Sequence, residues 1–385
     1  MHTLPYGRQW IDESDIEAVT SVLRSDFLTQ GPMVERFERA LCEAVGAHHA
    51  VAVSNGTAAL HLAAMALDLG PGKMLWTSPN TFVASSNCAL YCGADVDFVD
   101  IELETGNMDM AALSKKLATA KRKPDVVVPV HFAGQSCDMA ALGILKEKYG
   151  FKVIEDACHA IGGWDAQGRK VGGCAVADLA AFSFHPVKVV TTGEGGAVTT
   201  NDKTLADRIA LLRTHGITRD PIFMDSKADG PWDYHQIELG LNYRLTDIQA
   251  ALGFSQLSRL EDFVTRRNEL AHRYDDALIG FPLIPLKVRK GVRSAYHLYV
   301  VHLNDPSHRR LAFEALRKEG IHVQVHYIPV PSQPYYRHLG FRAEDFPMAL
   351  SHYAGALTLP LYPAMSNDDQ DRVVETLGRV LGAIA

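Results

Sequence analysis

Short, continuously apolar runs alternate with helical patterns between residues 50 and 200. Such runs are typical of strands that helices cover on both faces, as in a parallel sheet. Helical periodicity between the runs is clear over Thr57–Asp68 and Asp138–Tyr149. This alternation predicts an α/β architecture. The apolar runs are Ala50–Val53, Asp97–Val99, Val126–Val130, Lys152–Ile154 and Leu179–Phe184.

The pattern changes after residue 245. A long amphipathic stretch over Leu245–Leu278 predicts one helix that links two units. Beyond it, Tyr296–Leu303 and His322–Ile328 read as strands around a helix at Arg309–Lys318, which predicts a smaller α+β unit. We therefore expect an N-terminal segment with a large domain over residues 1–250 and a smaller C-terminal domain over residues 251–385. The boundary would fall within the long helix.

Composition and charge narrow the classes of function. The 385 residues are 47% hydrophobic and 22% charged, as in ordinary globular proteins. The net charge is -7 with no long Lys/Arg run, which argues against a nucleic-acid partner. No apolar stretch approaches the roughly 20 residues of a membrane span, and the N-terminus has no signal-peptide pattern. The six cysteines are scattered, which predicts free thiols, a cytoplasmic location and no metal site.

Three segments could carry chemistry. The first, Ser54-Asn55-Gly56-Thr57, directly follows an apolar run and opens a helical pattern. Backbone N–H groups and a Thr hydroxyl at a helix N-terminus bind phosphate well. The alternative is that Ser54 or Asn55 only caps the helix. No Gly-Lys-Ser/Thr follows, so this is not a Walker A loop.

The second segment places Asp156 at the end of the run Val153-Ile154-Glu155. Open α/β sheets bind ligands at the carboxyl ends of their strands. A buried carboxylate there needs a positive partner, and the protonated ring nitrogen of a cofactor would supply one. The alternative is an N-cap aspartate for a following helix.

In the third segment, Lys188 follows Phe182-Ser183-Phe184-His185 and precedes the glycine-rich turn Gly193–Gly196. A partly desolvated lysine at the ligand edge of a sheet can have the lowered pKa that a Schiff-base amine needs. The alternative is an ordinary solvated lysine. A phosphate cradle, an acid for a ring nitrogen and a later lysine are, together, the parts of a pyridoxal phosphate site.

Over nearly its whole length the chain resembles the DegT/StrS sugar aminotransferases, which have the fold of type I pyridoxal-phosphate enzymes. The motifs that carry the resemblance are Thr29-Gln30-Gly31-Pro32, Asn55–Leu60, Glu155-Asp156-Ala157, Ser183-Phe184-His185 with Lys188, Gly193–Gly196 and Asn242–Asp247. The resemblance implies an α/β fold with a three-layer, mostly parallel sheet, and pyridoxal 5'-phosphate as cofactor.

The resemblance also implies roles for individual residues. Lys188 matches the lysine that binds the cofactor covalently and moves the proton, and Asp156 matches the partner of the ring nitrogen. His159 matches a position near the phenolic oxygen of the cofactor. Asn242 matches a residue that reaches the cofactor phosphate of the neighbouring subunit, which implies a homodimer with shared sites. The remaining positions that match cofactor-binding residues are Gly56, Thr57, Phe82 and Ser183.

Within this family the chain is most similar to the subgroup that makes precursors of pseudaminic acid. Those enzymes transfer an amino group from L-glutamate to C4 of a UDP-linked 2-acetamido-2,6-dideoxy-4-ketohexose. For the diphosphate we expect a local positive group, either Arg244 or the basic loop at residues 287–293. By similarity the sugar nucleotide would be lined by Tyr6, Phe27, Leu28, Thr29, His326 and Tyr327.

Other functions remain as alternatives. The same residues would suit C4 amination of another nucleotide-linked 4-ketosugar, of the 4-amino-arabinose, perosamine or bacillosamine type. A sugar dehydratase of the same fold carries His at the position of Lys188, so the lysine argues against it. A non-catalytic regulator would need a basic patch or a helix-turn-helix, and neither is present in the sequence. An NAD-dependent enzyme would need a Gly-x-Gly-x-x-Gly motif after the first strand. The sequence has no such motif there, which argues against this alternative.

Overall fold

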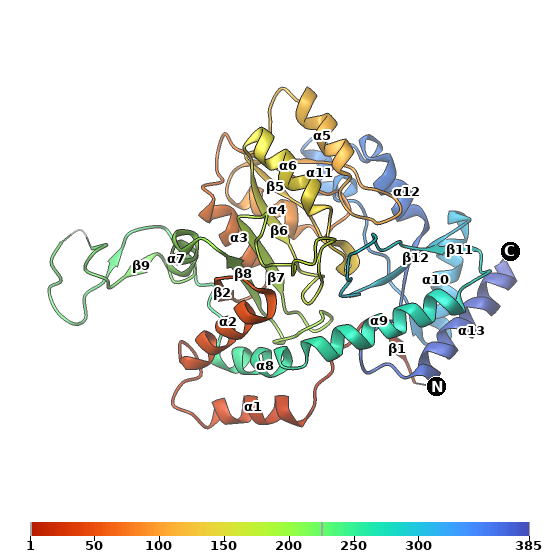
Figure 1. Ribbon diagram of the computed structural model, residues 1–385, viewed down its shortest axis with the longest axis horizontal. Helices are drawn as coiled ribbons and strands as arrows, with labels where there is room; N and C mark the ends of the chain where they lie inside the picture. Colours follow the sequence, from red (N-terminus) through yellow and green to blue (C-terminus); the bar gives the residue numbers. More distant parts are fainter. Residues whose placement is uncertain (1, 225, 385) are drawn as a thin grey trace.

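A seven-stranded sheet forms the centre of the computed structural model, which describes residues 2–224 and 226–384 (Figure 1). The strand order is β2-β8-β7-β6-β5-β3-β4. Only the pairs that β8 makes with β2 and β7 are antiparallel, so the predicted, mostly parallel sheet is confirmed. The strands are β2 (His49–Val53), β3 (Met74–Thr77), β4 (Asp95–Phe98), β5 (Val126–Val128), β6 (Lys152–Asp156), β7 (Leu179–Ser183) and β8 (Gly196–Thr200).

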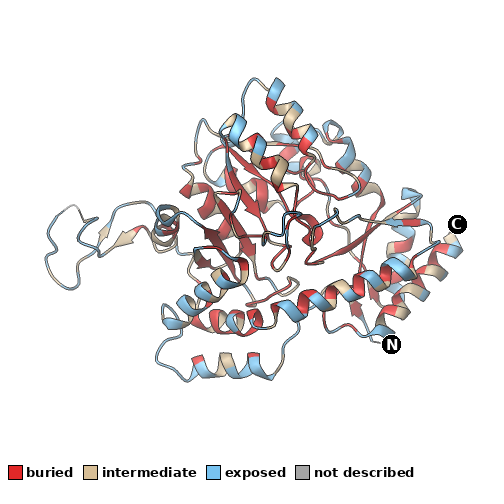
Figure 2. Ribbon diagram, in the orientation of Figure 1, coloured by how far each residue is buried: buried red, intermediate tan, exposed pale blue. Residues whose placement is uncertain are grey.

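Helices cover both faces of this sheet, and the buried strands lie between them (Figure 2). Successive residues of a strand point to opposite faces, so Leu179 packs in one core and Ala180 in the other. One face is covered by α3 (Gly56–Ala66), α4 (Ala84–Tyr91) and α7 (Lys203–Leu212). The other face is covered by α2 (Pro32–Val45), α5 (Met110–Thr119), α6 (Met139–Tyr149) and α8 (Asp247–Leu257). The remaining helix of this half is α1 (Glu13–Leu23).

The C-terminal part builds a second, smaller core. Its antiparallel sheet has the order β11-β12-β14, formed by β11 (Leu283–Pro285), β12 (Tyr299–Leu303) and β14 (Ala356–Leu359). The helices α9 (Leu260–Ala277), α10 (Arg309–Lys318) and α13 (Asn367–Ile384) pack on it. The N-terminal strand β1 (Leu4–Pro5) pairs with β13 (Ile321–His322), so the first residues of the chain lie in this smaller unit. The division at residue 250 stays a prediction.

The prediction of one helix over Leu245–Leu278 is wrong. The structure has two helices, because α8 ends at Leu257 and α9 begins at Leu260. Ser258 turns the chain there, and its Oγ donates to the carbonyl of Ser255 at 2.6 Å. The first half of α9 packs in the larger core and the second half in the smaller core, so the helix does connect the two.

Other element predictions differ in detail. The strand expected over His322–Ile328 is confirmed only at His322, the last residue of β13 (Ile321–His322), because the chain then forms an isolated bridge from Gln324 to Thr358 and turns toward the larger unit. The strands β3 and β8 were not expected from the apolar runs. The short connecting helices are η1 (Phe132–Gly134), η2 (Pro306–His308), η3 (Val330–Ser332), α11 (Pro334–His338), η4 (Ala343–Asp345) and α12 (Pro347–Gly355).

Three further features complete the fold. A hairpin of β9 (Ile217–Thr218) and β10 (His235–Gln236) projects from the side of the molecule (Figure 1). All six cysteines are free, as expected. Over the described ranges, no helix combines the length and apolar character needed to cross a membrane.

Candidate active site

A cavity of about 720 Å³ opens where the carboxyl ends of β6 and β7 meet the start of α3. This volume lies within the range of roughly 300–1,000 Å³ that is typical of small-molecule sites. The smaller unit closes one side of it with Tyr6, His326 and Tyr327. The predicted residues that line the cavity are Tyr6, Gly56, Thr57, Phe82, Asp156, His159, Ser183, Lys188, His326 and Tyr327.

The N-terminus of α3 forms one end of the cavity. The Asn55 side chain caps the helix by accepting from the Ala58 N–H at 2.8 Å, so the capping interpretation is confirmed. Gly56 and Thr57 nevertheless face the cavity together with Ser183 at the end of β7. A Cβ atom at position 56 would lie only 2.8 Å from the Cβ of Ser183, so the glycine keeps this end open. Free N–H groups and hydroxyls at a helix N-terminus suit a phosphate.

Asp156 ends β6 and is 5% exposed. Its Oδ2 accepts from the Ser85 hydroxyl at 2.5 Å, and its Oδ1 accepts from the Cys158 N–H at 3.2 Å. The next element after β6 is the strand β7, with no α-helix between them, so the alternative of an N-cap aspartate does not apply. The carboxylate lies in the wall of the cavity, where it can pair with a cationic ring nitrogen.

Lys188 reaches the same cavity from the turn after β7. Its side chain is half-buried, so the alternative of a solvated surface lysine does not hold. Burial lowers the pKa of Lys188, although the nearby Cys158 and Asp156 oppose this shift. No hydrogen bond or ion pair joins its Nζ to another described residue. An amine in this state is available as a nucleophile and as a proton acceptor.

His159 connects the two units across the cavity. Its Nε2 lies 3.1 Å from the hydroxyl of Tyr327, and its buried Nδ1 has no partner among the described residues. Burial, with smaller contributions from Lys188 and His326, holds the pKa of His159 well below its usual value. The ring of His326 packs 5.3 Å from that of Tyr6. His326 and Tyr327 therefore form a wall of the cavity, which we call the His326–Tyr327 wall.

Five of the predicted residues do not line the cavity of their own chain. Phe27 and Leu28 are about half exposed in the loop between α1 and α2, and Thr29 beside them is also exposed. Asn242 is exposed and bridges to Thr214. Arg244 lies in a separate hollow of about 290 Å³, and its guanidinium has no ion pair within the described chain. Their roles at the site stay predictions.

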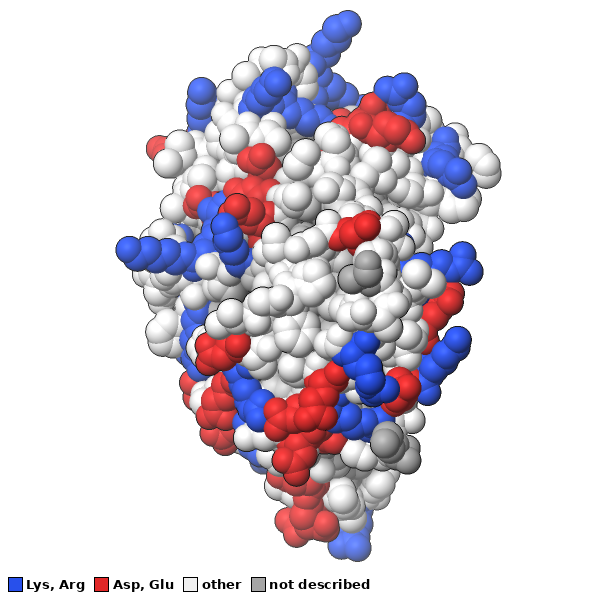
Figure 3. Space-filling view, turned by 90° about the vertical axis from the view of Figure 1, so that its right-hand side faces the viewer, with Lys and Arg blue, Asp and Glu red and all other residues white. Residues whose placement is uncertain are grey.

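The basic loop at residues 287–293 is less suited to a diphosphate than the sequence indicates. Arg289 pairs with Glu102 and, at 2.8 Å, with Asp138. Arg293 pairs with Glu261, which also holds it beside α9. These carboxylates already neutralise both guanidinium groups. The pairing favours a loop that only connects two strands over a loop that binds the diphosphate. On the face shown in Figure 3, positive and negative side chains are likewise intermixed.

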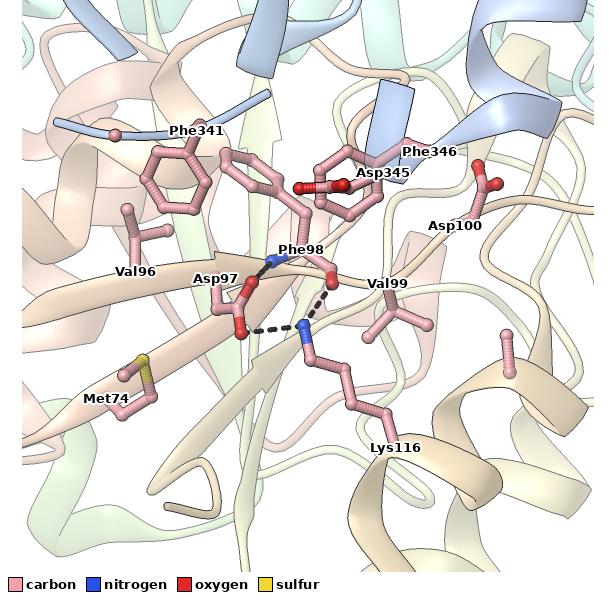
Figure 4. Close-up of a pocket in the computed structure, with 12 residues that line it drawn as sticks. Met74, Val96, Asp97, Phe98, Val99, Asp100, Lys116, Phe341, Asp345 and Phe346 are labelled. Atoms are coloured by element: carbon pink, nitrogen blue, oxygen red, sulfur yellow. Dashed lines mark hydrogen bonds and ion pairs between the residues drawn. The ribbon is translucent and has the colours of Figure 1, made fainter. Parts of the chain in front are cut away.

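A second cavity, of about 600 Å³, lies beside the edge strand β4 (Figure 4). Lys116 donates to the carbonyl of Phe98 at 2.6 Å and pairs with Asp97 at 2.6 Å. Asp97 also accepts from the N–H of Phe98 at 2.7 Å. Asp100 accepts from two N–H groups at the start of α12, and Asp345 pairs with an arginine. Because its charged groups are already partnered, this cavity is a protected sheet edge and no candidate for catalysis.

The model of the DegT/DnrJ/EryC1/StrS aminotransferase family matches residues 9–378. The chain belongs to this family. The aminotransferase is 41% identical to the spore coat polysaccharide biosynthesis protein SpsC of Bacillus subtilis, over 98% of this chain and 96% of SpsC. It is 38% identical to the UDP-4-amino-4,6-dideoxy-N-acetyl-beta-L-altrosamine transaminase of Campylobacter jejuni strain 81-176, over 98% of this chain and 97% of the relative.

Solved structures agree with this assignment. The aminotransferase PseC of Helicobacter pylori, involved in pseudaminic acid biosynthesis, superimposes with a TM-score of 0.91 at 31% identity, over 99% of this chain and 100% of that chain. The sugar aminotransferase Spr1654 of Streptococcus pneumoniae in its PLP form gives a TM-score of 0.91 at 29% identity, over 100% of both chains. The protein is therefore a sugar aminotransferase, and the family depends on pyridoxal phosphate.

The cavity of this aminotransferase fits that cofactor. The phosphate end requires an opening at a helix N-terminus, and Gly56 leaves the space that a Cβ would fill. The ring nitrogen requires a carboxylate, which Asp156 offers. The aldehyde carbon requires an amine without a competing partner, which Lys188 offers. These three groups converge on one cavity although they come from three separate segments of the sequence.

The structure adds site residues that the sequence did not single out. Ser85, at the start of α4, holds the Asp156 carboxylate, and its Oγ also lies 2.7 Å from the Thr81 hydroxyl. Tyr243 lines the cavity and belongs to the family motif Asn242–Asp247. Its place in that motif could have identified it from the sequence. For Ser85 no spacing in the sequence connects it to Asp156, 71 positions away.

Proposed function

We propose that this protein transfers the amino group of L-glutamate to C4 of a UDP-linked 2-acetamido-2,6-dideoxy-4-ketohexose, a precursor of pseudaminic acid. The observation that carries the catalytic part is the convergence of Lys188, Asp156 and the α3 N-terminus on one cavity. The choice of sugar is supported by the names of the Campylobacter jejuni relatives and of the Helicobacter pylori structure.

Each residue has a distinct part in this proposal. Gly56, Thr57 and Ser183 would hold the phosphate of the cofactor, Asp156 would hold its ring nitrogen, and Phe82 would stack on its ring. Bound pyridoxal phosphate supplies an electron sink for the carbanion that forms when a proton leaves the amino-bearing carbon.

Lys188 is the group that would accept and return this proton at Nζ. Burial lowers its pKa, so a larger fraction of the amine is neutral at a given pH than in a solvated lysine. His159 remains neutral for the same reason and can serve as a hydrogen-bond partner without adding a charge. Tyr6, His326 and Tyr327 would line the sugar.

The proposal includes a homodimer with shared sites. Asn242 and Arg244 lie outside the cavity of their own chain, while Asn242 is exposed and Arg244 forms no ion pair within the described residues. In a dimer, Asn242 of the partner subunit would reach the cofactor phosphate, and Arg244 would be free to bind the diphosphate of the substrate. Phe27, Leu28 and Thr29 would contact the sugar nucleotide in the same assembly.

A panel of nucleotide-linked 4-ketosugars tests the proposal. Each sugar is incubated with the protein and L-glutamate, and the product is identified by mass. We expect the UDP-linked 2-acetamido-2,6-dideoxy-4-ketohexose to gain an amino group at C4, and the Lys188→Ala variant to give none. Preferential amination of a different sugar would overturn the substrate assignment and leave the aminotransferase assignment in place.

A second candidate is C4 amination of another nucleotide-linked 4-ketosugar. The 41% identity to SpsC favours it, because that relative is named for spore coat polysaccharide biosynthesis and not for pseudaminic acid. The same panel separates the two candidates when it includes sugars of the 4-amino-arabinose, perosamine and bacillosamine types.

A further inference from the structure

Two hydrogen-bonded histidines, His302 and His352, lie behind the His326–Tyr327 wall. His352, on α12, is completely buried, and its Nε2 lies 2.8 Å from the carbonyl oxygen of His326. Its Nδ1 lies 2.9 Å from Nε2 of His302, a half-buried residue of β12. These hydrogen bonds therefore connect the half-buried His302 to the backbone of His326, a residue that lines the cavity.

The partners determine where the protons lie. A carbonyl oxygen can only accept, so the proton of His352 must be on Nε2, which donates to His326. A neutral His352 then has Nδ1 as an acceptor, so Nε2 of His302 donates to it. Burial, and to a smaller extent His302, lower the pKa of His352 to about 3, which is consistent with the neutral form. Both hydrogen bonds point toward the cavity.

The carbonyl that His352 binds belongs to the peptide between His326 and Tyr327. The other contacts of this peptide are to side chains of the larger unit and of β14. The Tyr327 N–H donates to Asn80 at 3.3 Å, and the ring of His326 lies 2.9 Å from the Thr358 hydroxyl. His352 does not itself line the cavity. Its donor group is the one that fixes the carbonyl side of the wall.

We propose that His352 is a positioning residue for the sugar substrate: with His302 behind it, it holds the His326–Tyr327 peptide so that both side chains face the sugar. This inference deepens the proposed function, because it requires a sugar that lies against this wall. It does not depend on which nucleotide-linked sugar is the substrate.

Two variants of the holoenzyme separate the hydrogen bond from the volume of the side chain. His352→Phe fills the space but has no donor. His352→Gln retains an N–H donor where Nε2 was and an oxygen that accepts from His302. We expect His352→Phe to raise the KM for the sugar nucleotide about tenfold, while kcat and the KM for L-glutamate change less than about threefold. We expect His352→Gln to stay within about threefold of wild type in all three.

Hydrogen exchange provides a readout that does not require turnover. The amide of Tyr327 is protected by Asn80 only while the peptide is held in place. We expect this amide to exchange at least about tenfold faster in His352→Phe, and at the wild-type rate in His352→Gln. If no sugar of the panel is aminated, the proposed function fails, and hydrogen exchange still decides the positioning role.

Controls make each outcome decisive. His338→Phe, on the exposed end of α11, introduces the same ring far from the wall and should change neither KM nor exchange. A loss of folded enzyme would lower kcat without changing the KM for the sugar. If His352→Phe does not fold, His302→Phe removes the donor one step further out and should shift both readouts in the same direction. Unchanged sugar KM and exchange in the variant that folds, or equal damage in His352→Gln, would overturn the inference.

Discussion

Asp156 is held in place by one hydroxyl and one backbone amide, and both donate to a carboxylate that also faces the cavity. A carboxylate can stabilise a cationic ring nitrogen, whereas an amide of the same shape cannot. Replacing Asp156 by asparagine therefore removes the charge and keeps the shape of the side chain.

We expect Asp156→Asn to retain the fold and to lower kcat about 10- to 150-fold, the equivalent of one charge-assisted contact of about 1.5–3 kcal/mol. Ser85→Ala is the matched control, because it removes the hydroxyl that orients the carboxylate but leaves the charge. It should lower kcat less than Asp156→Asn does. Steady-state kinetics with L-glutamate and the sugar nucleotide measures both. A kcat of Asp156→Asn within threefold of wild type would show that the charge is not needed.

The diphosphate offers a second comparison between residues. Arg244 forms no ion pair with another described residue, whereas Arg289 is paired with Glu102 and Asp138. We expect Arg244→Ala to weaken sugar-nucleotide binding about 10- to 150-fold, with little effect on the reaction with L-glutamate. Arg289→Ala should leave the affinity for the sugar nucleotide within about threefold. Calorimetric titration with the nucleotide diphosphate measures this, and equal affinities of the two variants would exclude Arg244 as the diphosphate ligand.

Candidate site residues could be predicted from the sequence where both the residue type and its place after an apolar run indicate a role. Residues whose role depends on contacts between distant segments could not be predicted. Lys188, Asp156 and Gly56 follow apolar runs, and the ends of such runs meet at one edge of a parallel sheet. Ser85 has no such signal, because its role arises only where the fold brings the start of α4 within hydrogen-bond distance of Asp156. The pairing of Arg289 with acids from two other segments was equally invisible, so the basic loop read as a free positive patch.

At the scale of elements, the family motif near residue 30 is joined to the one near residue 245. The buried carboxylate of Asp247, at the start of α8, accepts from the N–H of Gly31 at 2.7 Å and of Met33 at 2.8 Å. It thereby caps α2 from another helix. Gly31 has no room for a side chain, since a Cβ there would lie 2.5 Å from that of Phe27.

We expect Asp247→Ala to reduce the free energy of unfolding by about 2–4 kcal/mol, because it removes two buried, charge-assisted hydrogen bonds. Asp202→Ala is the control, because Asp202 also accepts from two backbone N–H groups at the start of a helix, α7, but is exposed. It should cost about 0.5–2 kcal/mol. Urea unfolding followed by circular dichroism gives both values, and an equal loss in the two variants would contradict the role assigned to Asp247.

Two of the differences from the predicted elements have separate physical causes. β8 begins with Gly196 and ends with two threonines, so it lacks the bulky apolar run used to find strands. A Cβ at Gly196 would lie 2.4 Å from the carbonyl oxygen of Asn55, and this close approach to the start of α3 requires glycine. The break between α8 and α9 was missed because the apolar periodicity continues on both sides of Ser258 and the residues there face the same core.

At the scale of the whole molecule, four buried histidines make stability depend on pH. Burial lowers the pKa of His326 and His352 to about 3, and holds those of His159 and His297 well below the usual value. In the unfolded chain these pKa values return to about 6.5. For these four, the unfolded state binds more protons as the pH falls below about 6.5, so their contribution to stability is present above this pH and is lost below it. His131, a fifth buried histidine, acts in the opposite direction: although burial opposes it, the contacts with Cys137 and Glu155 raise its pKa to about 10, which offsets the loss from one of the four.

We expect the free energy of unfolding to fall between pH 7 and pH 5 by up to about 2 kcal/mol for each of these histidines. Most carboxylates titrate below this window, so the loss there reports mainly on histidine. Urea midpoints at several pH values measure it. His352→Gln keeps its hydrogen bonds but cannot titrate, so its stability should fall less steeply than that of wild type. A midpoint that is constant from pH 7 to pH 5 would contradict the assignment of these histidines as neutral in the fold.

The proposed homodimer with shared sites leads to a prediction that requires both subunits. Lys188→Ala disables the cavity of its own chain, whereas Asn242→Ala should disable the cavity of the neighbouring subunit. When the two weakly active variants are mixed and allowed to exchange subunits, each heterodimer regains one intact site. Since half of the dimers are mixed and each has one good site of two, activity should recover to about a quarter of wild type.

The control for this experiment pairs Lys188→Ala with Asp156→Asn. Both changes lie in the cavity of their own chain, so no intact site can form in a mixed dimer and no activity should return. Native mass spectrometry verifies in both mixtures that heterodimers are present. If heterodimers form from Lys188→Ala and Asn242→Ala without recovery, Asn242 serves its own chain, and the shared site is excluded. Recovery confined to this pair would instead place Asn242 at the site of the neighbouring subunit.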